Sequence, residues 1–314
     1  MQTILGVTLP FFALILLGYV AAARRWVPPE SVPAFNGFLL YFAVPAMLFR
    51  FSANTPFAEI ANGRYLLGWS IAGVVVLLAV TFIARYVMRQ RLRDATFYGL
   101  AAAVANAGFL GVPLIVALLG ERGAAPAILA IAVDLVVVGS IGLILVELDG
   151  ATRSGWRQDV RDAAVRIFLN PFLLSMLLGA AFSGFGWKLS TPLAEIVKLL
   201  ADAAGPCALF AIGLSLVRPD APLKSPILAL PIAAKLVLHP LLVWLVMRAL
   251  GLDDFTTVAA VLVAALPSAG WVFIFALRYE ADAGRISATI LLTTALAFIT
   301  FSALVWALGI GRTG

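Results

Sequence analysis

Charged side chains are scarce in this sequence. Asp, Glu, Lys and Arg make up 12% of the 314 residues, whereas 63% are hydrophobic and the mean hydropathy is +1.05. A soluble domain of average composition carries roughly 25% charged residues. So few charges cannot cover the surface of a soluble protein of this length, so the composition predicts an integral membrane protein.

Cysteine and histidine are rarer still. Cys207 is the only cysteine and His239 the only histidine, so no intrachain disulfide can form. The sequence also lacks a P-loop, an HExxH motif and a GxSxG motif. These motifs mark nucleotide-binding, metal-dependent and serine-dependent chemistry. We therefore expect no enzyme, no cofactor and no metal, and ATP-driven transport would need a partner protein.

Apolar stretches long enough to cross a bilayer recur along the whole chain. A transmembrane helix needs about 20 apolar residues. Short polar segments such as RQRLRD and VRPDAPLKSP separate these stretches. The sequence predicts an all-α integral membrane protein with ten transmembrane helices, and the first is expected to be retained because arginines follow it. The spans lie near 3–23, 32–53, 65–88, 94–119, 124–148, 163–184, 192–217, 226–250, 255–279 and 284–309.

Basic residues are unevenly distributed between the segments that separate the spans. Segments after odd-numbered spans carry 14 Lys and Arg residues, and those after even-numbered spans carry five. Positively charged segments stay in the cytoplasm, so both termini are expected on the non-cytoplasmic side. The net charge of +6 then reflects topology and not nucleic-acid binding. The 14 are Arg24, Arg25, Arg85, Arg89, Arg91, Arg93, Arg153, Arg157, Arg161, Arg166, Arg218, Lys224, Arg278 and Arg285, and the five are Arg50, Arg64, Arg122, Lys188 and Arg248.

The two halves of the chain resemble each other at a constant spacing. LPFFALILLG at 9–18 resembles NPFLLSMLLG at 170–179, and VPAMLF at 44–49 resembles GPCALF at 205–210, both at an offset of 161 residues. The repeat unit holds five spans, and because five is odd, the second copy must enter the membrane from the opposite side. Inverted repeats with broken helices at matching positions are typical of secondary transporters.

The fourth and ninth spans each contain helix-breaking residues. ANAGFLGVPL at 105–114 lies in the fourth span and ALPSAGWVF at 265–273 lies at the corresponding place in the ninth. Each break frees backbone groups that lipid cannot satisfy, so we expect the two helices to cross and to line a cavity. The N-terminal ends of their second halves suit a small carboxylate. The residues expected at the substrate are Asn106, Gly108, Gly111, Pro113, Pro267, Ser268 and Gly270, with Pro45 and Pro206 kinking the matched second and seventh spans opposite them.

At these residues the sequence resembles the auxin efflux carrier family, which includes plant PIN-FORMED auxin exporters and bacterial carriers of malonate and related organic acids. The resemblance extends over essentially the whole chain. It is strongest in FLLYFAVPAMLF at 38–49, NAGFLGVPL at 106–114 and LPSAGWVFIFA at 266–276. It implies ten spans in an inverted repeat of five and five, with the fourth and ninth crossed, as in the related bile acid/sodium symporters.

The resemblance also implies a division of labour between the spans. Spans 1, 2, 6 and 7 form a scaffold, and spans 3–5 and 8–10 form a transport domain that moves like an elevator. We expect the first repeat over 1–148, a cytoplasmic linker over 149–162 and the second repeat over 163–314. Plant members carry a long loop where this linker lies, so regulation through such a loop is expected to be absent. Relatives often form homodimers through scaffold helices, although no interface motif is visible here.

Three ionisable residues lie deep inside predicted spans. Asp134 lies in the fifth span, and Lys235 and His239 lie four residues apart in the eighth, on one helix face. Ionisable residues inside a membrane are costly and mark functional sites by default. An Asp–Lys or Asp–His pair beside the crossing would neutralise the buried charge and would also suit proton coupling. There are three alternatives: the pair is purely structural, the lysine side chain reaches the membrane–water interface, or the residues do not contact one another.

Together these observations predict a secondary active transporter or uniporter of a small organic anion, such as malonate, malate or an auxin-like acid, in the bacterial inner membrane. The sequence leaves open whether a proton, a sodium ion or no co-ion accompanies the anion. The alternative function is a sodium-coupled symporter of the bile acid type. A receptor that binds without moving its ligand is a third hypothesis, and the expected absence of a signalling domain disfavours it.

Overall fold

The computed structural model describes residues 2–28, 31–57, 62–150, 171–215, 217 and 223–310. Within these ranges the regular elements are helices, and the one β-bridge joins Ala105 to Ser268. The predicted all-α class is therefore confirmed. The predicted linker over 149–162 lies almost wholly outside the described residues, as do Arg153, Arg157, Arg161, Arg166 and Arg218.

The described residues of the first half of the chain form eight α-helices, and several of them are continued by a short π-helical turn. They are α1 (Gln2–Ala23), α2 (Val32–Phe38), η2 (Leu39–Ala43), α3 (Val44–Asn54), α5 (Gly63–Phe82), η3 (Ile83–Val87), α6 (Leu92–Ala103), η4 (Ala107–Gly111), α7 (Val112–Leu119), η5 (Glu121–Gly123), α8 (Ala124–Val133), η6 (Asp134–Val138) and α9 (Gly139–Gly150). Of these short elements η5 is a 3-10 turn and the other η elements are π turns. Pro113 lies in the first turn of α7. A proline is tolerated there because the N–H that it lacks would have no partner within the helix.

The second half repeats this alternation of long and short helices. It contains α11 (Pro171–Phe185), α12 (Thr191–Ser215), the 3-10 turn η7 (Pro226–Leu228), α13 (Ala229–Ala233), the π turn η8 (Ala234–Leu238), α14 (His239–Ala249), α15 (Asp254–Ala264), α16 (Trp271–Arg278) and α17 (Ala283–Ala307). The side chain of Asp253 caps α15 by accepting from the backbone N–H of Thr256. A second hydrogen bond, from the Thr256 hydroxyl, holds the pKa of Asp253 below its usual value.

Six continuous helical stretches are long and apolar enough to cross a membrane. They are Val32–Asn54, Gly63–Val87, Glu121–Val146, Thr191–Leu214, Pro226–Ala249 and Ala283–Ala307. Four shorter apolar helices, Ala13–Ala23, Ala107–Leu119, Pro171–Phe185 and Asp254–Ala264, accompany them. The helices therefore support an integral membrane protein, and the count of ten spans stays a prediction.

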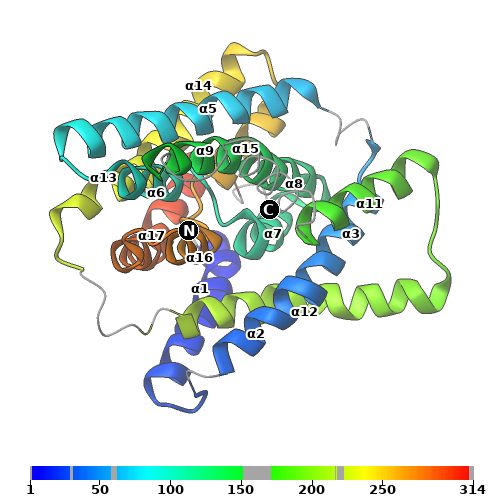
Figure 1. Cartoon of the computed structure of the whole chain (residues 1–314). Coiled ribbons are helices and arrows are strands. Elements are labelled where there is room, and N and C mark those ends of the chain that lie inside the picture. Colours follow the sequence, from blue (N-terminus) through cyan, green and yellow to red (C-terminus); the bar gives the residue numbers. More distant parts are fainter. Residues whose placement is uncertain are drawn as a thin grey trace.

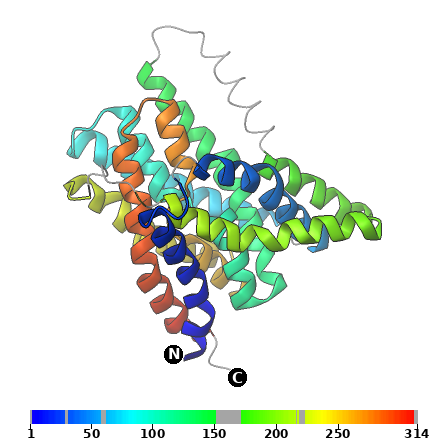
Figure 2. The ribbon, with the colours of Figure 1, turned by 90° about the horizontal axis from the view of Figure 1, so that it is seen from below.

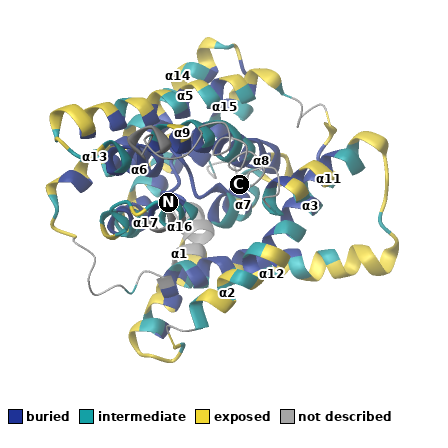
Figure 3. Cartoon of the chain, in the orientation of Figure 1, coloured by how far each residue is buried: buried dark blue, intermediate teal, exposed yellow. Residues whose placement is uncertain are grey.

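The helices form two groups. In Figure 1, α2 and α3 lie along α12 with α11 against α3, whereas α5, α6, α8, α9, α14 and α15 pack on one another above them. Figure 2 shows α1 beside α17, so the first and the last long helices are neighbours. Burial is greatest in the second group, where α6, α8 and α15 are almost entirely enclosed (Figure 3). Exposed apolar side chains cover the outer faces of α5, α11 and α12, as expected for lipid-facing helices.

Two helix contacts in the first group match each other across the chain. A Cβ atom added to Gly18 of α1 would clash with the carbonyl oxygen of Phe210 in α12. A Cβ atom added to Gly179 of α11 would lie 2.6 Å from the carbonyl oxygen of Phe49 in α3. Glycine is required where helix backbones approach this closely. Gly18 and Gly179 are 161 residues apart, and so are Phe49 and Phe210, so the contacts follow the offset of the sequence repeat.

Two further contacts set the direction in which the broken helices run. The Arg93 guanidinium, at the start of α6, donates to the carbonyl oxygen of Tyr279, just after α16, at 2.9 Å. At the other end of the same broken helix, just after α7, the Arg122 guanidinium lies 4.9 Å from the ring centre of Phe255 at the start of α15. The beginning of each broken helix therefore lies beside the end of the other, and the two run antiparallel.

Replacing Gly18 with leucine is expected to separate α1 from α12, because any side chain there meets the Phe210 carbonyl. Overpacking costs about 1–3 kcal/mol, so the melting temperature of the purified protein in detergent should fall by about 2–4 °C or more. Gly37→Ala is the control, since an added Cβ there has no neighbour within 4 Å. A Gly18→Leu protein that melts with the wild type would contradict the close contact.

Candidate functional site

The two broken helices cross at their breaks. Helix α6 ends at Ala103 and the chain resumes as η4 at Ala107, while α15 ends at Ala264 and resumes as α16 at Trp271. The two unwound segments pair antiparallel: the N–H of Asn106 donates to the Pro267 carbonyl at 2.9 Å, and the N–H of Ala269 donates to the Val104 carbonyl at 3.3 Å. Each break thus supplies backbone partners for the other.

Side chains satisfy further backbone groups at the crossing. The Ser268 hydroxyl donates to the Ala101 carbonyl at 2.5 Å, and the Ser268 N–H donates to the Thr293 hydroxyl at 3.3 Å. The N–H of Ala105 donates to the Asp134 carboxylate at 3.1 Å. Because unsatisfied buried backbone groups cost several kcal/mol in lipid, these three bonds hold the crossing in one arrangement.

Four backbone N–H groups at the breaks have no acceptor among the described residues. They belong to Gly108 and Phe109 in the first turn of η4 and to Gly270 and Trp271 at the start of α16. The first N–H groups of a helix have no partner within it and carry partial positive charge. Two helix N-termini therefore present free donors at the crossing.

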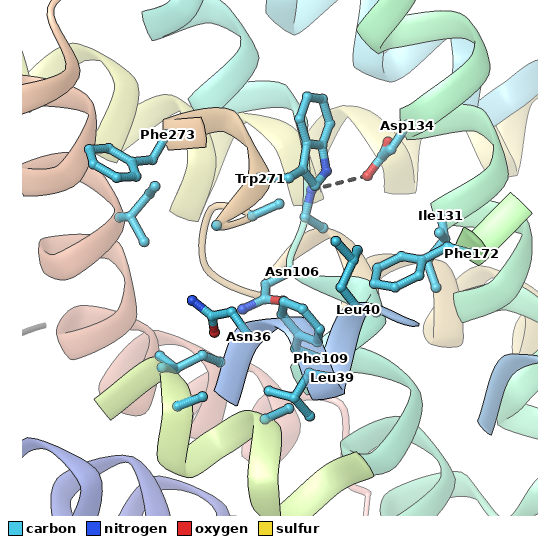
Figure 4. A pocket seen from close by; sticks show the side chains of 18 of the residues that line it. Asn36, Leu39, Leu40, Asn106, Phe109, Ile131, Asp134, Phe172, Trp271 and Phe273 are labelled. Carbon is cyan, nitrogen blue, oxygen red and sulfur yellow. Dashed lines mark hydrogen bonds between the residues drawn. The ribbon is translucent and has the colours of Figure 1, made fainter. Parts of the chain in front are cut away.

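All four of these residues line one cavity of about 280 Å³. Figure 4 shows the Asn106 amide from the break and the Asn36 amide from α2 at this cavity. Neither amide side chain has a hydrogen-bond partner among the described residues, so both can bind a ligand. The polar lining is completed by Asp134 and Ser287, and the aromatic lining consists of Phe109, Phe172, Trp271, Phe273 and Phe275.

The predicted substrate residues fall into three sets. Asn106, Gly108 and Gly270 line the cavity. Ser268 and Pro267 lie in the crossing itself, where they hold the two breaks together.

The remaining predicted substrate residues lie at packing contacts. A Cβ atom on Gly111 would lie 2.8 Å from the Leu266 side chain, and Pro113 lies against Gly205 of α12. Pro45 lies in the first turn of α3, and Pro206 lies inside α12 close to the cavity-lining Ala208. Neither proline lines the cavity, so the structure places both behind it.

The three ionisable residues predicted inside the spans, Asp134, Lys235 and His239, lie in one buried network. Asp134 accepts from the indole N–H of Trp69 at 2.8 Å, and the ring of Trp69 packs edge-on against His239 with centroids 5.5 Å apart. The Lys235 ammonium lies 2.9 Å from Nδ1 of His239. Asp134 and Lys235 interact electrostatically, yet no direct ion pair joins these two described residues. Trp69 and His239 therefore lie between the opposite charges.

Two features of the site escaped the sequence analysis. Asn36 lies in the predicted span 32–53, and an amide in an apolar stretch is the same signal that identified Asn106. Trp69 and the aromatic lining gave no comparable signal, because aromatic residues are common throughout an apolar chain. Among the described residues no group of three His, Cys, Asp or Glu side chains is placed to hold a metal ion.

Comparison with known proteins identifies the family. A family model described as membrane transport protein matches residues 3–306. The chain belongs to the auxin efflux carrier family of membrane transport proteins. This transporter is 34% identical to the "Putative malonate transporter" of Rhizobium meliloti over 309 residues, which cover 98% of this chain and 96% of that one.

Other relatives are more distant. The transporter YfdV of Escherichia coli K12 is 27% identical over 280 residues, covering 88% of each chain. Auxin efflux carrier component 3 of Arabidopsis thaliana is 25% identical over 155 residues, which cover 48% of this transporter and 24% of the plant protein. The similarity to bacterial members therefore extends over nearly the whole chain.

Replacing Asp134 with alanine is expected to destabilise the crossing, because the N–H groups of Ala105 and Trp69 lose their acceptor. Each buried donor left unpaired costs about 1–3 kcal/mol, so the melting temperature should fall by several degrees. Asp134→Asn keeps one acceptor oxygen and should lose less. Asp254→Ala removes an exposed carboxylate worth less than about 1 kcal/mol and is the control; equal melting of Asp134→Ala and this control would contradict the network.

Proposed function

We propose that this membrane transport protein carries a small organic carboxylate across the bacterial inner membrane, with the substrate bound at the crossing of the two broken helices. The observation that supports this most directly is the set of four free N–H groups that meet at one cavity. Helix N-termini with free donors bind anions through partial charge and hydrogen bonds together. The Asn36 and Asn106 amides add donors beside them.

The lining also fits an anion that must be released again. Among the described residues, no lysine, arginine or histidine lines the cavity, so a carboxylate is held by partial charges and not by a full ion pair. The rest of the wall is mainly apolar and aromatic, which suits the carbon body of a small acid. The printed name of the Rhizobium relative, which concerns malonate, makes malonate the first acid to test.

The proposed transport cycle uses ten spans in two inverted five-span repeats. The matched contacts of Gly18 with Phe210 and of Gly179 with Phe49 support this arrangement, because each repeat then supplies one glycine and one carbonyl. The antiparallel crossing of α6–α7 with α15–α16 supports it as well. In this proposal α1, α2–α3, α11 and α12 are the scaffold, and the remaining helices move the crossing from one side of the membrane to the other.

The membrane potential is sufficient to drive one direction of this transport. A potential of 100 mV is worth about 2.3 kcal/mol per elementary charge, so an inside-negative membrane expels an anion without a co-ion. Import would need a proton or sodium. We propose uniport or proton coupling, and sodium-coupled symport is the outcome that a sodium-dependent current would indicate.

Transport currents test the proposed function. Proteoliposomes on a solid-supported membrane are expected to give a current with malonate, malate, 2-oxoglutarate or indole-3-acetate, and Asn106→Ala should reduce it at least about tenfold if the amide contributes 1.4 kcal/mol or more to binding. Asn54→Ala, which removes an exposed amide at the end of α3, should leave the current unchanged. Each acid is applied with sodium and with choline, at two pH values.

The outcomes separate the hypotheses. A current abolished by Asn106→Ala and unchanged by sodium supports carboxylate transport at the crossing. No current with any of the four acids would contradict the proposed substrate class. Saturable binding of an acid without any flux would indicate a receptor.

Asn36 offers a second test, because it reaches the cavity from α2, in the proposed scaffold, whereas Asn106 belongs to the proposed moving part. Asn36→Ala is expected to raise the KM for substrate on one side of the membrane by about tenfold or less, with little change on the other side, since a single neutral hydrogen bond is worth about 0.5–1.5 kcal/mol. Asn106→Ala should affect both sides. Currents recorded with substrate gradients of opposite direction measure this; equal effects of Asn36→Ala on both sides would contradict the assignment.

A further inference from the structure

The breaks free carbonyl groups as well as N–H groups. Helix α15 ends at Ala264. The carbonyls of Val261 and Val263 accept from the N–H groups of Ala265 and Leu266 just beyond the helix, whereas the Ala264 carbonyl has no backbone donor among the described residues. This end of a helix carries partial negative charge. The Ala264 carbonyl, which points out of the broken end, accepts a hydrogen bond from the Lys235 ammonium at 3.0 Å. A cation therefore covers the negative end of the first half of the ninth predicted span.

Lys235 is completely enclosed. Its side chain is 0% exposed, and it is absent from the lining of the cavity, so it does not reach a substrate there. It is held at the crossing by the π turn η8, next to α14. Its position makes it part of the wall behind the crossing and not part of the substrate site.

The second contact of Lys235 defines the tautomer of His239. An ammonium group only donates, so Nδ1 of His239 accepts from it at 2.9 Å and the ring proton lies on Nε2. Nε2 is buried without a partner among the described residues. The imidazole is therefore a neutral ligand of the ammonium, in the way that it would be a neutral ligand of another cation.

Asp134 supplies the opposite charge. Its carboxylate binds the freed N–H of Ala105 at 3.1 Å, and the field of Lys235 reaches it past Trp69. Asp134 thus covers a freed donor of one break while Lys235 covers a freed acceptor of the other. A buried carboxylate in this place needs a neighbouring positive charge, and Lys235 provides it without any ion from solution.

We propose that Lys235 is a tethered counter-cation: its ammonium occupies a built cation site, formed by the Ala264 carbonyl and Nδ1 of His239 with the Asp134 carboxylate beyond Trp69, and thereby makes the carrier independent of a dissolved cation. The role in transport rests on the proposed function, whereas the cation site itself is tested by the binding of small cations to Lys235 variants. It follows that truncating Lys235 opens a vacancy that a small monovalent cation can fill.

Thermal unfolding in detergent tests the vacancy without any transport. Lys235→Ala leaves space at the site, whereas Lys235→Met fills the same space with an uncharged chain of similar length. Both are expected to melt about 6 °C or more below the wild type in choline chloride, because each leaves a buried charge unpaired. Replacing choline chloride with methylammonium chloride, sodium chloride or ammonium chloride should raise the melting temperature of Lys235→Ala and leave Lys235→Met and the wild type unchanged.

Transport by the same variants tests the consequence. In choline chloride Lys235→Ala is expected to carry carboxylate at least about tenfold more slowly than the wild type, a loss of 1.4 kcal/mol, and methylammonium should restore most of the rate. Lys235→Met should be equally slow and not restored. Lys198→Ala, which removes an exposed lysine of α12, should transport as the wild type does in every salt.

A further variant covers the case in which Lys235→Ala cannot be purified. Lys235→Gln keeps a donor for the Ala264 carbonyl but not the charge, so it should fold and transport at least about tenfold more slowly than the wild type. Transport by Lys235→Gln at the wild-type rate would overturn the inference, since a neutral hydrogen bond would then be enough.

The two proposals fail in different ways. Equal salt responses of Lys235→Ala and Lys235→Met, in melting and in transport, would overturn the tethered counter-cation while leaving carboxylate transport intact. Absence of carboxylate flux in the wild type would overturn the proposed function, and stabilisation by small cations of Lys235→Ala, but not of Lys235→Met, would still establish the cation site.

Discussion

A chain that crosses a bilayer must satisfy its backbone polar groups from within the protein, and the two breaks of this transporter meet that requirement with each other. The unwound residues after α6 and after α15 pair as a short antiparallel bridge. Neither break would be stable alone, because its N–H and C=O groups would face lipid or an empty interior. Mutual pairing fixes where the two helices cross, and with it the place of the cavity, of Asp134 and of Lys235.

The same requirement explains the unusual electrostatics of the interior. Groups freed by the breaks that cannot reach the other segment are met by charges of opposite sign, a carboxylate on an N–H and an ammonium on a carbonyl. Buried charges are tolerated when they are paired and hydrogen-bonded. Here each charge forms a hydrogen bond with a backbone group freed by a break, and the pair is neutral overall. Among the described residues of the two breaks, the N–H groups that face the cavity keep no acceptor, and these are the donors to which we assign the substrate.

Much of this arrangement could be predicted from the sequence, since Gly, Pro and Asn inside long apolar stretches are strong signals. The breaks, Asn106 and the three buried ionisable residues were found in that way. The sequence does not predict which face of its helix a residue such as Gly111 or Pro113 occupies, because the neighbouring residues are apolar on every face. The structure places those two against Leu266 and Gly205. The link between Asp134 and Lys235 runs through Trp69 of α5, and it depends on how three distant helices pack.

The positions of the two buried charges depend on π-helical turns, each of which holds one residue more than an α-helical turn. Asp134 begins η6 and Lys235 is the second residue of η8. Turns of this kind gather at functional sites. Loss of a single residue within η8 would let this turn close as an ordinary α turn, and Lys235 would lose the wider turn that places it at the end of α15. The position of this charge is therefore sensitive to insertions and deletions as well as to substitutions.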